Sequence, residues 1–185
     1  MSTNSSGTTL SRYPADRPLE DDTGTWWVLH TKPNSEKLVA QYLMNREVSY
    51  YMPLLIKKKR VGGLKRLRTI VVPLFRGYLS FALDREKHYL LHDSKKFVRI
   101  IEVVDQERFV RELVAISKAI ESHQDILVCP GIVPGKEVLI RSGPLAGYEG
   151  RVVQKTKQRK LALSVNMFNR SVVVTLDSWT DLEPL

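Results

Sequence analysis

The sequence predicts an α+β protein of two units, in which a mixed unit of helices and strands precedes a small all-β unit. Up to residue 121, apolar residues alternate between the strand period of two and the helical period of 3.6, in the order β-α-β-β-β-(α)-β-α. After a Pro- and Gly-rich segment, five short strand candidates follow. So few short strands can satisfy their edges by curling into a small barrel.

The first elements follow from composition and periodicity. Residues 1–25 are rich in Ser, Thr, Asp, Pro and Gly, so we expect a disordered tail. An aromatic and aliphatic run at 26–30 predicts a strand, and Asn34 or Ser35 can cap a helix that ends near residue 46. Residues 48–54 alternate as a half-buried strand does.

The middle of the chain predicts a hairpin and further strands. Gly62 and Gly63 lie within a run of cations and suit a hairpin turn. Alternation along 78–83 directs Leu79 and Phe81 inward and leaves Tyr78 and Ser80 on the outer face. The other elements that we expect in this unit are a strand at 69–75, a short helix at 85–92, a strand at 97–103 and a helix at 105–121, capped by Asp105.

The C-terminal part begins with a predicted linker at residues 122–135, where Pro and Gly cluster. The five strand candidates are 136–141, 148–155, 161–165, 170–176 and 179–182. We therefore expect four segments, namely a tail at 1–25, a first domain at 26–121, the linker and a second domain at 136–185.

Length and composition exclude several classes of protein. With 185 residues, 43% hydrophobic and 26% charged, the chain is too short for a large barrel enzyme and too apolar for wholesale disorder. No apolar run approaches the roughly 18–20 residues of a membrane-spanning helix, and no secretory signal is evident. Cys129 is the lone cysteine, which excludes an internal disulfide. We expect a cytoplasmic monomer without membrane contact.

Positive charge is concentrated in the middle of the chain. The formal net charge of +9 divides into −2 for residues 1–25, +8 for 26–125 and +3 for 126–185. Seven cations fall within residues 57–68, with no acidic residue among them: Lys57, Lys58, Lys59, Arg60, Lys65, Arg66 and Arg68. Such a cluster predicts binding to nucleic-acid phosphates; the alternative is a solvated basic loop.

No motif for catalysis or cofactor binding is recognisable. The four histidines are scattered, and neither a phosphate-binding loop nor a paired-carboxylate motif occurs. His88 and His92 could share a helix face as zinc ligands do, but a third ligand is missing and an ordinary polar role is favoured. The sequence therefore predicts a binding protein rather than an enzyme, with no cofactor and no metal.

Two local motifs resemble the NusG family of transcription elongation factors, and the similarity extends over residues 26–185. Residues 73–79, PLFRGYL, resemble the Phe-Pro-Gly-Tyr turn of the family's N-terminal (NGN) domain, with Arg76 in place of proline. Residues 143–152, GPLAGYEGRV, match a KOW motif, and residues 165–170, VNMFNR, resemble the segment that follows it. The opening strand and the basic hairpin resemble the specialised RfaH-like branch.

The resemblance implies an α/β sandwich with an antiparallel sheet, followed by a five-stranded SH3-like KOW barrel. It also implies that the first domain binds the clamp of the largest RNA polymerase subunit. The positions that match the family's contact residues are Phe75, Tyr78, His30 and Ser80. The alternative for Phe75 and Tyr78 is a role in the core.

The same resemblance places the basic hairpin beside upstream or non-template DNA, as in RfaH-like factors. It assigns Met167, Phe168 and Arg170 to a surface that binds a ribosomal protein or the helicase Rho. The alternative for Phe168 is that it caps the barrel core. Gly143, Gly147 and Gly150 have a structural interpretation, because tight reversals and close strand packing exclude a Cβ.

The resulting hypothesis is a transcription elongation factor that suppresses pausing or termination. The alternative hypothesis is a ribosome-associated or general RNA-binding protein, because KOW barrels and basic hairpins also occur in ribosomal proteins.

Overall fold

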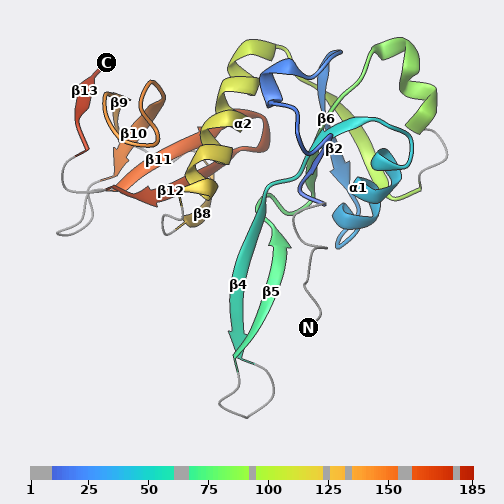
Figure 1. The fold of residues 1–185 in the computed structure, drawn as a ribbon, viewed down its shortest axis with the longest axis horizontal. Coiled ribbons are helices and arrows are strands. Elements are labelled where there is room, and N and C mark those ends of the chain that lie inside the picture. The colour runs from blue at the N-terminus through green and yellow to red at the C-terminus, as the bar shows by residue number, and fades with distance from the viewer. Residues whose placement is uncertain are drawn as a thin grey trace. The chain divides into compact units, whose positions relative to one another are not determined.

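The computed structural model describes residues 10–60, 67–91, 95–122, 126–131, 135–153, 160–176 and 180–185. The chain divides into two compact units, Met1–Val103 and Val104–Leu185. Each unit has its own antiparallel sheet, and Figure 1 labels the helices and strands. The predicted α+β class is confirmed.

A five-stranded sheet forms the centre of the first unit, with the strand order β1-β3-β6-β2-β7. Its strands are β1 (Arg12–Tyr13), β2 (Trp26–Thr31), β3 (Ser49–Tyr51), β6 (Tyr78–Ala82) and β7 (Phe97–Glu102). The register pairs Trp27 with Phe81 and Leu29 with Leu79, so these side chains share one face. All four belong to the buried core, which confirms the inward direction predicted for residues 79 and 81.

Helix α1 (Glu36–Met44) contributes Val39, Ala40 and Leu43 to the same core. Leu38, the apolar residue next to Val39, is 57% exposed. Successive residues advance by about 100° around a helix, so Leu38 projects away from the face that Val39 buries.

The N-terminal segment corrects the prediction of a disordered tail at 1–25. Strand β1 pairs with β3, and the short 3-10 helix η1 (Leu19–Asp21) buries Leu19. The Asp22 carboxylate is inaccessible to solvent and pairs with Arg12 at 3.1 Å and with Arg17 at 3.4 Å. Paired charges of this kind order a polar segment that has few apolar residues. Residues 1–9 lie outside the described part of the chain.

Strands β4 (Leu54–Arg60) and β5 (Leu67–Pro73) form a separate two-stranded sheet (Figure 1). We call this pair of strands the β4–β5 ribbon. Their register runs from Leu54 opposite Pro73 to Arg60 opposite Leu67. The cations before and after residues 61–66 therefore lie on paired antiparallel strands, as the hairpin interpretation requires. The 3-10 helix η2 (Arg85–Leu91) occupies the position of the short helix expected at 85–92.

The second unit combines helix α2 (Gln106–Glu121) with a six-stranded antiparallel sheet of order β13-β9-β10-β11-β12-β8. Asp105 caps the helix, as predicted, and its Oδ1 accepts a hydrogen bond from the Arg108 amide at 3.0 Å. The strands are β8 (Ile126–Pro130), β9 (Lys136–Ile140), β10 (Glu149–Val153), β11 (Lys160–Val165), β12 (Arg170–Thr175) and β13 (Leu182–Pro184).

One strand of this sheet was not among the predicted strand candidates. Strand β8 lies within the expected linker at 122–135 and pairs with β12, with Val128 opposite Val172, so the sheet has six strands rather than five. The division into compact units falls after Val103 and places α2 in the same unit as the C-terminal strands. Helix α2 packs against β11 and buries Phe109, Leu113 and Ile116.

Candidate protein and nucleic-acid interfaces

The bend between β5 and β6 is tied to helix α1. Glu36 is buried, and its Oε1 accepts a hydrogen bond from the Gly77 amide at 2.8 Å. The Gly77 carbonyl accepts a hydrogen bond from the Thr31 amide at 2.9 Å, and the Tyr78 amide donates to Phe75 O at 3.1 Å. The bend that leads into Tyr78 is therefore held from two neighbouring elements.

His30 and Tyr78 lie opposite each other on β2 and β6. Their rings stack with 5.3 Å between centroids and an interplanar angle of 21°. Both side chains are partly exposed. They form an accessible pair of rings beside the bend, which can contribute apolar area to an interface with little loss of conformational entropy.

Phe75 and Ser80, the other two predicted contact residues, lie in the interior. Phe75 is 3% exposed and Ser80 is 1% exposed. Strand parity placed Ser80 on the face opposite the core of Leu79 and Phe81, and it does lie there, but that face is also buried at this position. Alternation determines which face a side chain occupies, not whether that face is open to solvent. Of the four predicted contact residues, only His30 and Tyr78 therefore have accessible side chains.

The β4–β5 ribbon carries accessible cations. Lys57, Lys58 and Arg68 are exposed. Lys59 and Arg60 lie on β4 by backbone register, whereas Lys65 and Arg66 lie outside the described residues. The base of the ribbon is fixed by a hydrogen bond from Lys37 Nζ on α1 to Val71 O at 2.8 Å.

The segment proposed to bind a C-terminal partner is the 3-10 helix η3 (Asn166–Phe168) with the residues that follow it. Phe168 is not an exposed apolar tip, because it is only 2% exposed. Its ring makes an edge-to-face contact with Phe109 of α2, with 5.9 Å between centroids. Met167 lies in η3, and Arg170 is partly exposed with its Nη1 donating to Asn169 O at 3.0 Å.

The backbone at the KOW-like glycines disfavours a side chain. Gly143 and Gly147 have φ angles of +84° and +87°, a region that other residues rarely adopt. A Cβ on Gly150 would lie 2.8 Å from Leu161 Cδ1, so β10 and β11 approach each other too closely for a side chain at this position.

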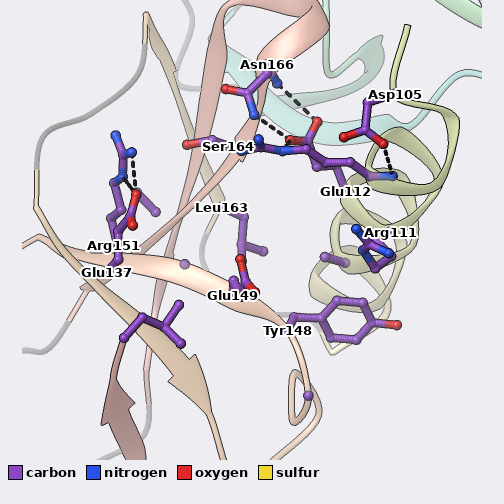
Figure 2. Close-up of a pocket in the computed structure, with 16 residues that line it drawn as sticks. Asp105, Arg111, Glu112, Glu137, Tyr148, Glu149, Arg151, Leu163, Ser164 and Asn166 are labelled. Atoms are coloured by element: carbon purple, nitrogen blue, oxygen red, sulfur yellow. Dashed lines mark hydrogen bonds and ion pairs between the residues drawn. The ribbon is translucent and has the colours of Figure 1, made fainter. Parts of the chain in front are cut away.

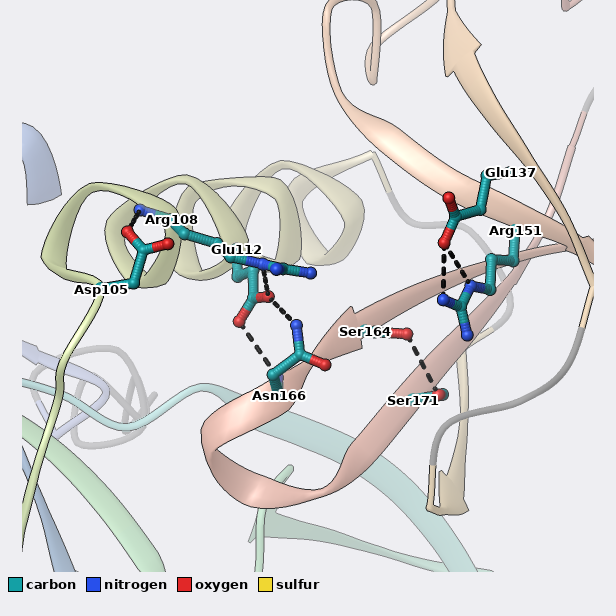
Figure 3. A network of polar contacts seen from close by, with 8 residues as sticks. All are labelled: Asp105, Arg108, Glu112, Glu137, Arg151, Ser164, Asn166 and Ser171. Carbon is teal, nitrogen blue, oxygen red and sulfur yellow. Dashed lines mark hydrogen bonds and ion pairs between the residues drawn. The ribbon is translucent and has the colours of Figure 1, made fainter. Parts of the chain in front are cut away.

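A polar cluster that the sequence did not predict connects α2 to η3 (Figure 3). Glu112 accepts hydrogen bonds from the Asn166 amide at 3.1 Å and from Asn166 Nδ2 at 2.6 Å. Arg108 Nε also donates to Glu112, at 3.2 Å. Burial raises the pKa of Glu112, and the hydrogen bonds from Asn166 oppose this shift. The residues are 54 positions apart, so no local pattern could have indicated the contact.

Beside this cluster lies a cleft of about 690 Å³ within the second unit (Figure 2). Its lining mixes both signs of charge, and Arg151 and Glu137 neutralise each other at 2.6 Å. The cleft therefore has no uniform field for an anion or a cation.

In the part of the chain that the structure describes, no three His, Cys, Asp or Glu side chains come together in a way that could hold a metal ion. His92, one of the two candidate zinc ligands, lies outside that part of the chain. Within the same residues, no helix is both long enough and apolar enough to cross a bilayer.

Comparison with known proteins assigns the chain to a family. The family described as "Transcription termination factor nusG" matches residues 24–123, more than half of the chain. The chain belongs to the NusG family. NusG-family proteins are transcription factors without enzymatic activity, and they bind RNA polymerase. The matched NusG range continues past Val103 and through helix α2.

Comparison with solved structures finds a weak likeness. A structure titled "Domain interaction in Thermotoga maritima NusG" is 17% identical, with a TM-score of 0.46, and the match covers 87% of this chain and 97% of that chain. No curated protein matches this NusG-family chain.

Proposed function

We propose that this NusG-family chain is an elongation factor of the RfaH-like type that binds the clamp of the largest RNA polymerase subunit and suppresses pausing or termination. The observation that carries the proposal is the stacked pair of His30 and Tyr78 beside the bend that Glu36 holds. Residues 26–121 supply this surface, and residues 136–185 form the KOW domain.

The proposed surface is small, partly polar and preorganised. Aromatic side chains on fixed strands bury area at low entropic cost, which is the property of interface anchors. His30 adds a polar ring to the patch, so the surface that we propose for partner binding contains hydrogen-bonding groups as well as apolar ones. Phe75 supports the bend from inside rather than contacting the partner.

Binding would act on transcription through a shift in populations. A factor that prefers the closed clamp moves the open–closed equilibrium by its difference in affinity for the two states. The exposed cations of the β4–β5 ribbon support an additional contact with upstream or non-template DNA near the clamp.

The proposed partner of the C-terminal unit is a ribosomal protein or Rho, bound through Met167, Phe168 and Arg170. The Phe168 side chain is packed against Phe109, whereas the Arg170 side chain is partly exposed to solvent. A partner that uses the Phe168 ring must displace it from α2.

The test is recovery of core RNA polymerase with the tagged full chain from a nuclease-treated lysate. We expect His30→Ala with Tyr78→Ala to lower the affinity for purified core polymerase at least about tenfold. Tyr89→Ala is the matched control, because Tyr89 lies in the same unit and is 65% exposed. If the double variant binds as the wild type does, or if ribosomal subunits are recovered in place of polymerase, the proposal is wrong.

A further inference from the structure

We infer that the β4–β5 ribbon binds double-stranded DNA by entering the major groove, with cations on both of its faces against the phosphates that border the groove. This inference rests on the proposed contact with DNA and specifies the form of nucleic acid that the ribbon recognises.

The ribbon carries exposed cations on both of its faces. Lys57 lies opposite Ile70 and Lys58 lies opposite Thr69, and neighbouring residues of a strand project to opposite faces. Arg68 is two residues from Ile70, so it shares the face of Lys57. All three cations are exposed. The ribbon is therefore positively charged on both faces, whereas a one-sided platform has its cations on a single face.

The hairpin sequence contains no aromatic side chain on which a base could stack. Residues 54–73 contain neither Phe, Tyr nor Trp, and neither Asp nor Glu. Proteins that hold single strands gain affinity by stacking the bases on aromatic side chains. A hairpin that has cations but no aromatic side chains prefers the denser charge of a duplex, which has one charge per roughly 1.7 Å against roughly 3.4 Å in one strand.

The dimensions of the ribbon suit the major groove of B-form DNA. The major groove of B-form DNA is about 12 Å wide and about 8.5 Å deep, and it admits a two-stranded ribbon. The stretch of β4 from Lys57 to Arg60 spans roughly 10 Å at about 3.3 Å per residue, which is comparable with the groove depth. A-form RNA has a deep, narrow major groove that excludes such an element.

The base of the ribbon is held in place before any ligand binds. The Leu74 amide donates to Pro53 O at 2.8 Å, and Lys37 Nζ donates to Val71 O at the same distance. A two-stranded hairpin alone is marginally stable in water, so these bonds reduce the entropy that ordering on DNA would otherwise lose.

The experiment measures binding of the full chain to labelled oligonucleotides by fluorescence anisotropy at several salt concentrations. We expect a DNA duplex of about 20 base pairs to bind at least about tenfold more tightly than either of its strands or an RNA duplex of the same sequence. A duplex whose major groove is filled by glucosylated hydroxymethylcytosine should bind at least about tenfold more weakly than the unmodified duplex. Equal binding in either comparison overturns the inference.

Variants test the use of both faces. Loss of one phosphate contact lowers the slope of log K against log salt by about 0.9 for duplex DNA. We expect Lys58→Gln to lower the slope by about 0.9 and Lys57→Gln with Arg68→Gln to lower it by about 1.8. Lys136→Gln is the control, because Lys136 is an exposed lysine of β9 and should leave the slope unchanged. If Lys58→Gln alone behaves like this control, the two-faced arrangement is wrong.

Failure of this inference can be distinguished from failure of the proposed function. Polymerase binding is measured in the absence of DNA and depends on His30 and Tyr78. A chain that binds core polymerase but shows no preference for the duplex refutes only the present inference.

Discussion

Glu36 determines the geometry of the candidate polymerase contact at the scale of a single residue. Its buried carboxylate accepts the hydrogen bond of the Gly77 amide, and Gly77 immediately precedes Tyr78. Without this acceptor, a partly buried amide would remain unpaired at the bend. Glu36 is therefore a positioning residue for the His30–Tyr78 pair.

Replacing Glu36 separates its role as an acceptor from its charge. We expect Glu36→Ala to lower the free energy of unfolding by about 1–3 kcal/mol, because it leaves the Gly77 amide without its acceptor. Glu36→Gln retains a side-chain oxygen and should have less than half of this effect. Urea unfolding of the three proteins measures the difference; equal loss in both variants would show that the charge matters rather than the hydrogen bond.

Glu112 predicts a pH dependence of stability. Burial raises its folded-state pKa above the usual value of 4.5, despite the hydrogen bonds from Asn166 and Arg108. The folded protein thus holds this proton more tightly than the unfolded chain does. The stabilisation from protonated Glu112 is fully present below the unfolded pKa and is lost as the pH rises through the raised folded pKa.

The measurement compares wild type and Glu112→Gln by chemical unfolding at about pH 4 to 7. We expect the stability of the wild type relative to the variant to decrease as the pH rises, because Gln remains neutral throughout. Urea transitions that differ by a constant amount over this range would contradict the raised pKa.

At the scale of elements, β8 shows that a segment can form a strand although turn-forming residues lie at its end and directly after it. Pro130 and Gly131 favoured a linker, but residues 126–130 are paired along their length with β12. The preceding apolar residues Ile126, Leu127 and Val128 have the β-propensity that pairing requires. The sequence could not reveal that one edge of β12 is open to pair with these residues.

Amide hydrogen exchange tests this strand. We expect the amides of residues 126–129 that face β12 to exchange much more slowly than those of an unstructured linker, with protection that approaches that of β12 itself. Exchange of this segment within the dead time of the measurement, with β12 protected, would contradict the pairing. The exposed residue Val104 provides an internal reference for an amide between elements.

At the scale of the whole molecule, the N-terminal segment belongs to the folded protein. Residues 10–25 contribute strand β1, the buried Leu19 and the Arg12–Asp22 ion pair. Burial of a leucine side chain alone stabilises a protein by about 1.5–3 kcal/mol.

Two truncations test this contribution. We expect deletion of residues 1–25 to lower the free energy of unfolding by about 2 kcal/mol or more, since it removes the buried Leu19. Deletion of residues 1–9 leaves these contacts in place, so we expect it to lower the free energy of unfolding by less than the longer deletion does. Thermal or urea unfolding of both proteins provides the comparison, and equal effects would contradict the assigned role of residues 10–25.

The candidate site was partly predictable. The register of β2 and β6 makes His30 and Tyr78 neighbours, and alternation correctly separated Leu79 and Phe81 from Tyr78 and Ser80. Burial of Phe75 and Ser80 was not predictable, because accessibility depends on what covers a face and not on the strand that carries it. The same reason explains why the sequence left open whether Phe168 faces a partner or caps the core; in the structure it is packed against Phe109.

The sequence by itself determined the order of the main helices and strands, the faces of β6, the glycines of the KOW-like turn and the basic ribbon. These depend on local periodicity, on backbone conformation and on charge, which short stretches of chain specify. Only the tertiary structure decided the pairing of β8 with β12, the burial of Asp22 and the Glu112–Asn166 contact. Each of these joins residues that are apart in the chain, and its stability comes from desolvation and hydrogen bonding that arise only once the chain has folded.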